Sequence, residues 1–196
     1  VLKAGAAFVH IDASLPADRI AGIIRKTGAP FILYDGKTDP DKLNEVARRE
    51  GKAIVALNDL NKAQDQPQLP FTRKVQLPSS LAYIQVTSGT TGEPKCIMIE
   101  HCNLVAFMEA DEPEFLGSWT TSKLQLSNRT FDIAMADVFG TLGRGGRLVL
   151  GPDAEILSSL AEWLEMTSVT DLNTSPLVAD LLKNNVPAHL SVLMVG

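Results

Sequence analysis

The sequence predicts an α/β fold in which helices alternate with the strands of a parallel sheet. Short apolar runs typical of strands lie at residues 8–11, 31–34 and 52–57, and amphipathic segments typical of helices lie between them. Strands that alternate with helices favour βαβ units, which build parallel sheets. Of the 196 residues, 45% are hydrophobic, which is enough for a substantial core. This length predicts one domain, within which two lobes are possible.

The first two helices have recognisable ends. Residues 14–16 begin the first helix, because Pro16 near its first turn loses no hydrogen bond, and Gly28 ends it. The second helix runs from about Asp39 to Glu50. The residues expected on their buried faces are Ile20, Ile23, Ile24 and Thr27 in the first, and Leu43, Val46 and Ala47 in the second.

Residues 58–80 form the one linker-like stretch of the chain. They are rich in Gln, Asn, Asp and Pro and show little apolar periodicity. We therefore expect a surface connection between two lobes here.

The stretch from residue 81 to residue 95 predicts a phosphate-binding loop. An apolar strand at 81–86 and another at 96–99 flank a loop of glycines and hydroxyl residues. Glycines let successive backbone N–H groups turn toward an anion. The hydroxyl donors, the glycines and the positive charge expected to bind phosphate are Thr87, Ser88, Gly89, Thr90, Thr91, Gly92 and Lys95.

Two other interpretations of this loop are disfavoured. A Walker A loop needs a glycine where Pro94 stands and Ser or Thr where Cys96 stands. A flexible linker rarely lies between two apolar strands.

The second half of the chain continues the alternation of helices and strands. A helix begins at His101, and residues 111–122 are expected to form a loop. The expected strands are residues 123–126, 145–150, 169–172 and 190–195, and the expected helices are 130–142, 155–166 and one that begins at Ser175.

The helix at 130–142 has two distinct faces. Residues at helical spacing are expected in the core: Phe131, Ala134, Met135, Val138, Phe139 and Leu142. Asp132, Ile133 and Ala136 lie on the opposite face and would line a pocket with one carboxylate at its rim. Alternatively, Asp132 only complements the helix dipole, with Thr130 as the N-cap.

Composition excludes several classes of function. The net charge is −5 and no basic cluster offers a footprint for nucleic acid. No apolar run approaches the roughly 20 residues of a membrane span. The two cysteines, Cys96 and Cys102, do not make a disulfide framework, so we expect reduced thiols in a cytoplasmic protein. A catalytic thiol at Cys96, a catalytic base at His10 and a metal site at His101 and Cys102 are all disfavoured.

The string TSGTTGEPK at residues 87–95 resembles the phosphate loop of the adenylate-forming superfamily, which includes acyl-CoA synthetases, luciferases and adenylation domains of nonribosomal peptide synthetases. The resemblance implies layered sheets with helices packed between and around them, and it implies that ATP and Mg²⁺ are used. Lys95 and Thr87 would be catalytic. Residues 2–19 resemble a core motif of adenylation domains, although His10 replaces a usual proline, Phe8 a usual tyrosine, and Cys96 a common glycine of the loop.

The pair Phe131 and Asp132 resembles the Phe-Asp pair of peptide synthetases, in which the aspartate holds the substrate α-ammonium. The segments 169–176 and 193–196 also resemble adenylation domains. By this resemblance the side-chain pocket consists of Asp132, Ile133, Ala136, Asp171, Met194 and Gly196. A second acid, Asp171, favours a substrate with a polar or cationic side chain, because an unpaired buried carboxylate is costly.

The resemblance identifies the chain as a piece of the large N-terminal subdomain of such a domain, expected to be truncated at both ends. The implied reaction is amino-acid activation as aminoacyl-AMP, followed by transfer to phosphopantetheine on a peptidyl carrier domain, beside condensation domains of the same chain. Residues 1–196 alone are expected to release no pyrophosphate in response to amino acids. The alternatives are an acyl- or aryl-CoA synthetase and a non-catalytic nucleotide-binding descendant.

Overall fold

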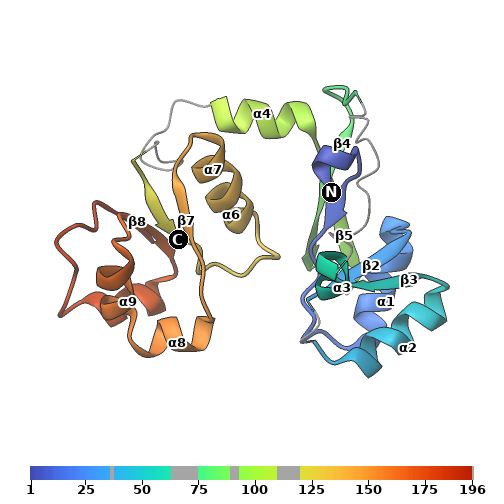
Figure 1. Cartoon of the computed structure of the whole chain (residues 1–196), viewed down its shortest axis with the longest axis horizontal. Coiled ribbons are helices and arrows are strands. Elements are labelled where there is room, and N and C mark those ends of the chain that lie inside the picture. Colours follow the sequence, from blue (N-terminus) through green and yellow to red (C-terminus); the bar gives the residue numbers. More distant parts are fainter. Residues whose placement is uncertain (36–37, 63–74, 89–92, 110–119, 196) are drawn as a thin grey trace. The chain divides into compact units, whose positions relative to one another are not determined.

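The structure, a computed structural model, describes residues 1–35, 38–62, 75–88, 93–109 and 120–195. It confirms the α/β class (Figure 1). By internal contacts the chain divides into two units, residues 1–101 and 102–196. The sequence placed the connection between lobes near residues 58–80, whereas this division falls after His101. Part of that stretch is helical, since α3 spans Leu57–Lys62, and residues 63–74 lie outside the described residues.

The described part of the first unit holds two sheets. In one, β2 (Phe31–Tyr34) and β3 (Ala53–Ala56) pair in parallel. The other has the order β1-β4-β5, formed by β1 (Phe8–Val9), β4 (Leu81–Ser88) and β5 (Pro94–Glu100). β1 is parallel to β4, and β4 and β5 form an antiparallel hairpin.

The helices of the first unit begin and end close to the expected residues. A short 3-10 turn, η1 (Leu2–Ala4), precedes α1 (Ala17–Thr27) and α2 (Pro40–Glu50). Asp39 caps α2 by accepting hydrogen bonds from the N–H groups of residues 41 and 42. Gly28 and Gly51 end the two helices with positive φ. The core between these helices and the β2–β3 sheet contains Ile20, Ala21, Ile24, Leu43 and Val46.

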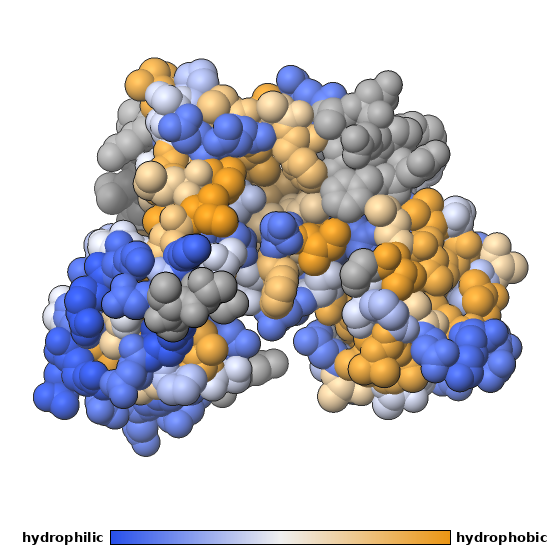
Figure 2. Space-filling view, turned by 180° about the vertical axis from the view of Figure 1, so that it is seen from behind, coloured by the Kyte–Doolittle hydropathy of each residue, from blue (hydrophilic) through white to orange (hydrophobic). Residues whose placement is uncertain are grey.

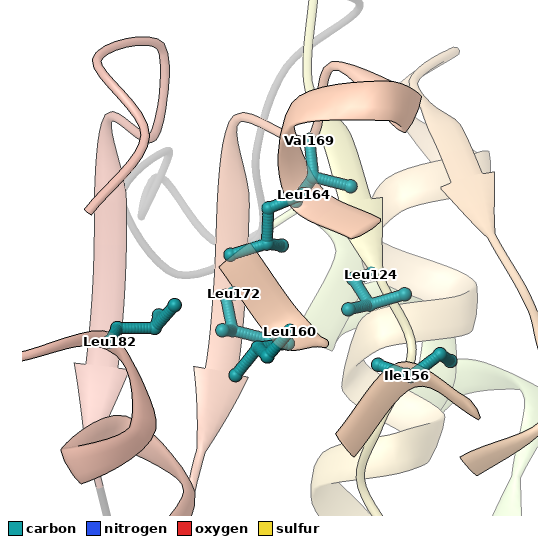
Figure 3. Close-up of a cluster of buried hydrophobic side chains, with 7 residues drawn as sticks. All are labelled: Leu124, Ile156, Leu160, Leu164, Val169, Leu172 and Leu182. Atoms are coloured by element: carbon teal, nitrogen blue, oxygen red, sulfur yellow. The ribbon is translucent and has the colours of Figure 1, made fainter. Parts of the chain in front are cut away.

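The second unit is built on one parallel sheet with the order β7-β6-β8-β9. Its strands are β6 (Ser122–Leu124), β7 (Arg147–Val149), β8 (Asp171–Thr174) and β9 (Val192–Val195). One face of the sheet packs on helices through an apolar core, whose buried members are Leu124, Ile156, Leu160, Leu164, Val169, Leu172 and Leu182 (Figure 3).

The helices of this unit are shorter than the sequence predicted. The expected helix at 155–166 is two helices, α8 (Asp153–Ser158) and α9 (Leu160–Thr167), because Ser159 leaves the helical conformation at φ −149°. α4 (His101–Glu109) begins at His101 as expected. α10 (Pro176–Ala179) continues into the 3-10 turn η4 (Asp180–Leu182).

The helix expected at 130–142 differs most from the prediction. It consists of α6 (Asp132–Met135), a π-helical turn η3 (Ala136–Gly140) and α7 (Thr141–Gly143). A π turn inserts an extra residue and rotates everything after it. The predicted core face is only partly right: Leu142, after the π turn, is exposed and Asp137, within it, is fully buried. Phe131 is exposed for another reason, because it is the extended N-cap residue before α6.

The surface of the second unit carries many exposed apolar side chains. They include Leu177, Leu181 and Val195, and Figure 2 shows hydrophobic residues gathered on this unit, with hydrophilic ones covering much of the α2 side of the first. None of the helices in the described ranges has the length and apolar character that crossing a bilayer requires.

Candidate functional site

The β4–β5 hairpin brings together the two residues expected to be catalytic. Thr87 and Lys95 are directly opposite each other in the antiparallel register, so their side chains project from the same face. Both residues are exposed. Ser88 pairs with Pro94 in the same ladder. The remaining loop residues of the prediction, Gly89 to Gly92, lie outside the described residues.

A second lysine lies beside this hairpin. Lys26, in the last turn of α1, donates a hydrogen bond from Nζ to the carbonyl oxygen of Pro94 at 2.7 Å. The same Nζ lies 4.0 Å from Oε2 of Glu93. This contact fixes the end of the loop to the helix, and the sequence pattern gave no sign of it because 68 residues separate the two partners.

In the second unit, Asp132 stands at the start of α6 with its side chain exposed. Its Oδ1 accepts a hydrogen bond from the N–H of Ile133 at 2.8 Å. Thr130 does not cap the helix as the alternative interpretation expected. The N-cap residue is Phe131, and the Thr130 hydroxyl instead donates to Oδ1 of Asn128 at 2.8 Å.

The structure describes four of the other five expected pocket residues, all in the second unit. Ile133 lies on α6 and is half-buried, and Ala136 begins η3 and is buried. Met194 lies on β9 in register with Asn173 of β8. Gly196 lies outside the described residues.

Asp171 is buried on β8, in register with Lys123 of β6. Its Oδ2 accepts a hydrogen bond from the hydroxyl of Thr170 at 2.5 Å. The positive charge of Lys123 also interacts with this carboxylate. Asp171 therefore needs no polar or cationic group from a substrate, because Thr170 and Lys123 already interact with its carboxylate.

The sequence analysis missed a cluster of buried polar side chains on the sheet face opposite the apolar core. Lys123, Asp137 and Asn173 come from β6, η3 and β8 and are almost completely buried. The Nδ2 of Asn173 donates to Oδ1 of Asp137 at 2.6 Å, and Nζ of Lys123 lies 3.9 Å from the same oxygen. The available signal was Lys123 within a run expected to be a buried strand.

Burial shifts the protonation of both charged members. Desolvation raises the pKa of Asp137 to about 6, although Lys123 and the Asn173 hydrogen bond act in the opposite direction. Desolvation also lowers the pKa of Lys123, against the attraction of Asp137 and Asp171. Both charges have counterparts in the interior: Asp137 and Asp171 attract Lys123, and Lys123 and the Asn173 amide stabilise Asp137.

Within the described ranges, no three His, Cys, Asp or Glu side chains are arranged to hold a metal ion. The exposed lysine and threonine of the hairpin fit phosphate oxygens, because one offers a positive charge and the other a hydroxyl donor. An exposed carboxylate at Asp132 fits a cationic group.

Comparisons with known proteins identify the family of the chain. The family model "AMP-binding enzyme" matches residues 1–194. The nonribosomal peptide synthetase agiA of Aspergillus flavus is 43% identical over 201 residues, which cover 100% of this chain and 3% of that protein. The chain therefore spans a small part of the curated relatives it matches.

Three solved structures share the fold. An adenylation and PCP protein, holo-PA1221 bound to a vinylsulfonamide inhibitor, has a TM-score of 0.77 at 24% identity, covering 100% of this chain and 32% of that one. The AMPPNP-bound nonribosomal peptide synthetase FmoA3 has a TM-score of 0.77 at 26% identity, covering 98% and 20%. The N-terminal subdomain of Klebsiella oxytoca NpsA also matches, with a TM-score of 0.75 at 25% identity, covering 94% of this chain and 46% of that one. The chain belongs to the AMP-binding enzyme family and corresponds to part of the N-terminal subdomain of nonribosomal peptide synthetase adenylation domains.

Proposed function

We propose that the protein containing this chain activates an amino acid with ATP, forming aminoacyl-AMP and pyrophosphate. The observation that carries the proposal is the exposed carboxylate of Asp132, which among the described residues forms an ion pair with no cation. An α-ammonium bound away from bulk water needs an ionised partner. A substrate without an amino group would bring no cation to the carboxylate of Asp132.

The hairpin would act on the nucleotide. Thr87 and Lys95, on one face of the hairpin, would hold oxygens of the β- and γ-phosphates, together with the residues from Ser88 to Gly92. Their hydroxyl and ammonium groups stabilise charge that develops on the leaving pyrophosphate. AMPPNP in FmoA3 supports the use of ATP by this family. Mg²⁺, when bound with ATP, would share the phosphate charge.

The substrate carboxylate is itself the nucleophile, and it attacks the α-phosphorus of ATP. Asp132 would fix the ammonium and so limit the orientations of that carboxylate. Ile133, Ala136, Asp171, Met194 and Gly196 are proposed to surround the side chain of the amino acid.

The second step is proposed to transfer the aminoacyl group to the thiol of phosphopantetheine on a carrier domain, as expected of a peptide synthetase with condensation domains. The carrier domain joined to adenylation in PA1221 supports this proposal. A cytoplasmic location stays a prediction that rests on Cys96 and Cys102, neither of which forms a disulfide.

ATP–pyrophosphate exchange by the full-length protein tests the first step. The panel should contain the common amino acids and simple aliphatic and aromatic carboxylic acids. We expect exchange with one or a few amino acids. Asp132→Ala should reduce kcat/KM about 100-fold or more, because a charge-assisted contact in the transition state is lost.

Asp153→Ala is the matched control. Asp153 is an exposed acid in the first turn of α8, so it complements a helix dipole as Asp132 does and should leave the exchange unchanged. Exchange only with acids that lack an amino group would instead establish an acyl- or aryl-CoA synthetase. ATP binding without any exchange would establish a non-catalytic descendant.

A further inference from the structure

The polar cluster of Lys123, Asp137 and Asn173 has no part in the proposed reaction, yet its three side chains are almost completely buried. Each of the three side chains exposes 3% of its surface or less. Replacing a buried ion pair by apolar residues often costs little or even stabilises a protein. The cluster therefore calls for a role other than stability.

Its geometry joins three elements at a single atom. Oδ1 of Asp137 accepts the 2.6 Å hydrogen bond from Asn173 of β8 and lies 3.9 Å from Nζ of Lys123 on β6. Adjacent strands in the middle of the parallel sheet thus hold the same carboxylate oxygen from two directions. The carboxylate is fixed to the sheet, and so is the backbone that carries it.

That backbone is the π turn η3, which follows directly after α6. π turns interrupt the α-helical hydrogen-bond ladder and often lie at functional sites. Asp132 is the first residue of α6, five positions before Asp137. Phe131, which precedes it, is 60% exposed and offers little packing at this end. α6 is packed through Ala134 and Met135 and runs directly into η3, so a displacement of η3 would be passed to the helix turn that carries Asp132.

We propose that Lys123, Asp137 and Asn173 are positioning residues, which anchor η3 to β6 and β8 and so fix the carboxylate of Asp132 for the substrate ammonium. This inference rests on the proposed amino-acid activation. None of the three need touch the reacting atoms. Loss of the anchor should weaken use of the amino acid and leave use of ATP unchanged, since the hairpin residues lie in the other unit.

The first test is steady-state ATP–pyrophosphate exchange by the full-length protein and three variants: Lys123→Met, Asp137→Asn, and the double variant. Each single variant removes one member of the ion pair and leaves the other charge buried, with only Asp171 still facing Lys123 or only the Asn173 amide still bound to Asp137. Asp137→Asn should raise the amino-acid KM about tenfold through misplacement of Asp132, with the ATP KM within about twofold of wild type.

The double variant is the decisive rescue. It has neither charge, and the asparagine at 137 can still accept the hydrogen bond from Asn173. Its amino-acid KM should return to within about threefold of the wild-type value, because the two sites act as one unit. A double variant no better than the worse single variant would overturn the proposal.

Asp180→Asn serves as the control. It breaks an exposed ion pair with Lys183 of 3.0 Å in the same unit and should change neither KM. Equal increases in the KM values for amino acid and ATP in Asp137→Asn would indicate general loosening and would also overturn the proposal.

A second test does not depend on activity. Hydrogen exchange of the amides of residues 132–140 should be about tenfold faster in Asp137→Asn than in wild type, while residues 160–167 of α9 keep their protection. The double variant should restore the slow exchange. If wild type shows no amino-acid-dependent exchange activity, the proposed function fails, and the amide measurement still decides whether the cluster anchors η3. Unchanged amide rates would refute the anchor.

Discussion

The β4–β5 hairpin of the first unit and the α6–η3 segment of the second place their charged groups in opposite environments. Lys95 and Thr87 are exposed on paired strands, whereas Asp137 lies in the interior with Lys123. An exposed charge costs little until a ligand arrives, but a buried charge is tied to the stability of the fold. Changes in the hairpin should therefore alter chemistry alone, and changes in the buried cluster should alter both chemistry and stability.

The largest effect on stability is expected from Asp137→Leu. This variant leaves Lys123 charged in the interior and removes the acceptor of Asn173. The unfolding free energy of the second unit should fall by about 3–5 kcal/mol. Hydrogen exchange of the β8 amides in the full-length protein measures it. Asp180→Leu, at an exposed ion pair, should cost less than about 1 kcal/mol. Comparable losses of unfolding free energy in Asp137→Leu and Asp180→Leu would show that the buried charge stabilises the fold no more than the exposed one.

The largest effect on chemistry is expected from Lys95→Ala. Loss of its positive charge should lower kcat/KM for ATP–pyrophosphate exchange by about 100-fold or more. The melting temperature should stay the same, because the exposed side chain has little effect on packing. Lys183→Ala, at an exposed lysine of the second unit, should leave exchange unchanged. A fall in melting temperature that accompanies the loss of activity would show that the hairpin lysine is structural.

The two regions also differ in how far the sequence predicts them. In the hairpin, the expected strands appear with somewhat longer bounds, and Thr87 and Lys95 come together because an antiparallel ladder fixes which residues are opposite. That relation is local and follows from the chain order. The parallel register that brings Asp171 beside Lys123 connects residues 48 positions apart, and no local pattern specifies it.

The π turn marks the limit of prediction from periodicity. A spacing of 3.6 residues assigned Leu142 to the core and left Asp137 unassigned, but one inserted residue rotates the second half of the segment. The partners of Asp137 are Lys123 and Asn173. Both belong to strands, and the helical spacing of residues 130–142 carries no information about them. The buried face could be predicted only with knowledge of those tertiary contacts.

The pH dependence of stability would sharpen the comparison further. Burial raises the pKa of Asp137 to about 6 in the folded state, from a usual value of 3.8. The folded state therefore holds this proton more tightly than the unfolded state. The stability that the protonated carboxyl group of Asp137 contributes is fully present below about pH 4 and is lost as the pH rises through 6.

Wild type should accordingly lose about 2 kcal/mol relative to Asp137→Asn between pH 4 and pH 7. Lys123 and Asp171 are the charged groups that share this face, and both remain in the variant. Hydrogen exchange of the β8 amides, corrected for intrinsic rates, measures the difference. If the unfolding free energies of wild type and Asp137→Asn change in parallel with pH, Asp137 has the same pKa in the folded and unfolded states.

The smallest expected effect concerns Lys26, which is half-exposed and so lies between the two environments. Its Nζ donates to the Pro94 carbonyl at the end of the phosphate loop. Lys26→Met keeps the aliphatic stem but removes this hydrogen bond, whose net value is about 1 kcal/mol. The KM for ATP should rise about threefold to fivefold while the amino-acid KM stays constant.

Lys42→Met is a closely matched control for Lys26→Met. The Nζ of Lys42 also donates to backbone carbonyls, those of Ala13 at 2.5 Å and Leu15 at 3.2 Å, in the same unit but at α2. Both variants lose the same kind of bond, so any shared effect reflects stability, and an effect on ATP confined to Lys26→Met reflects the position of the loop. If the two variants bind ATP equally well, the loop is held by its own backbone, and the hairpin needs no support from α1.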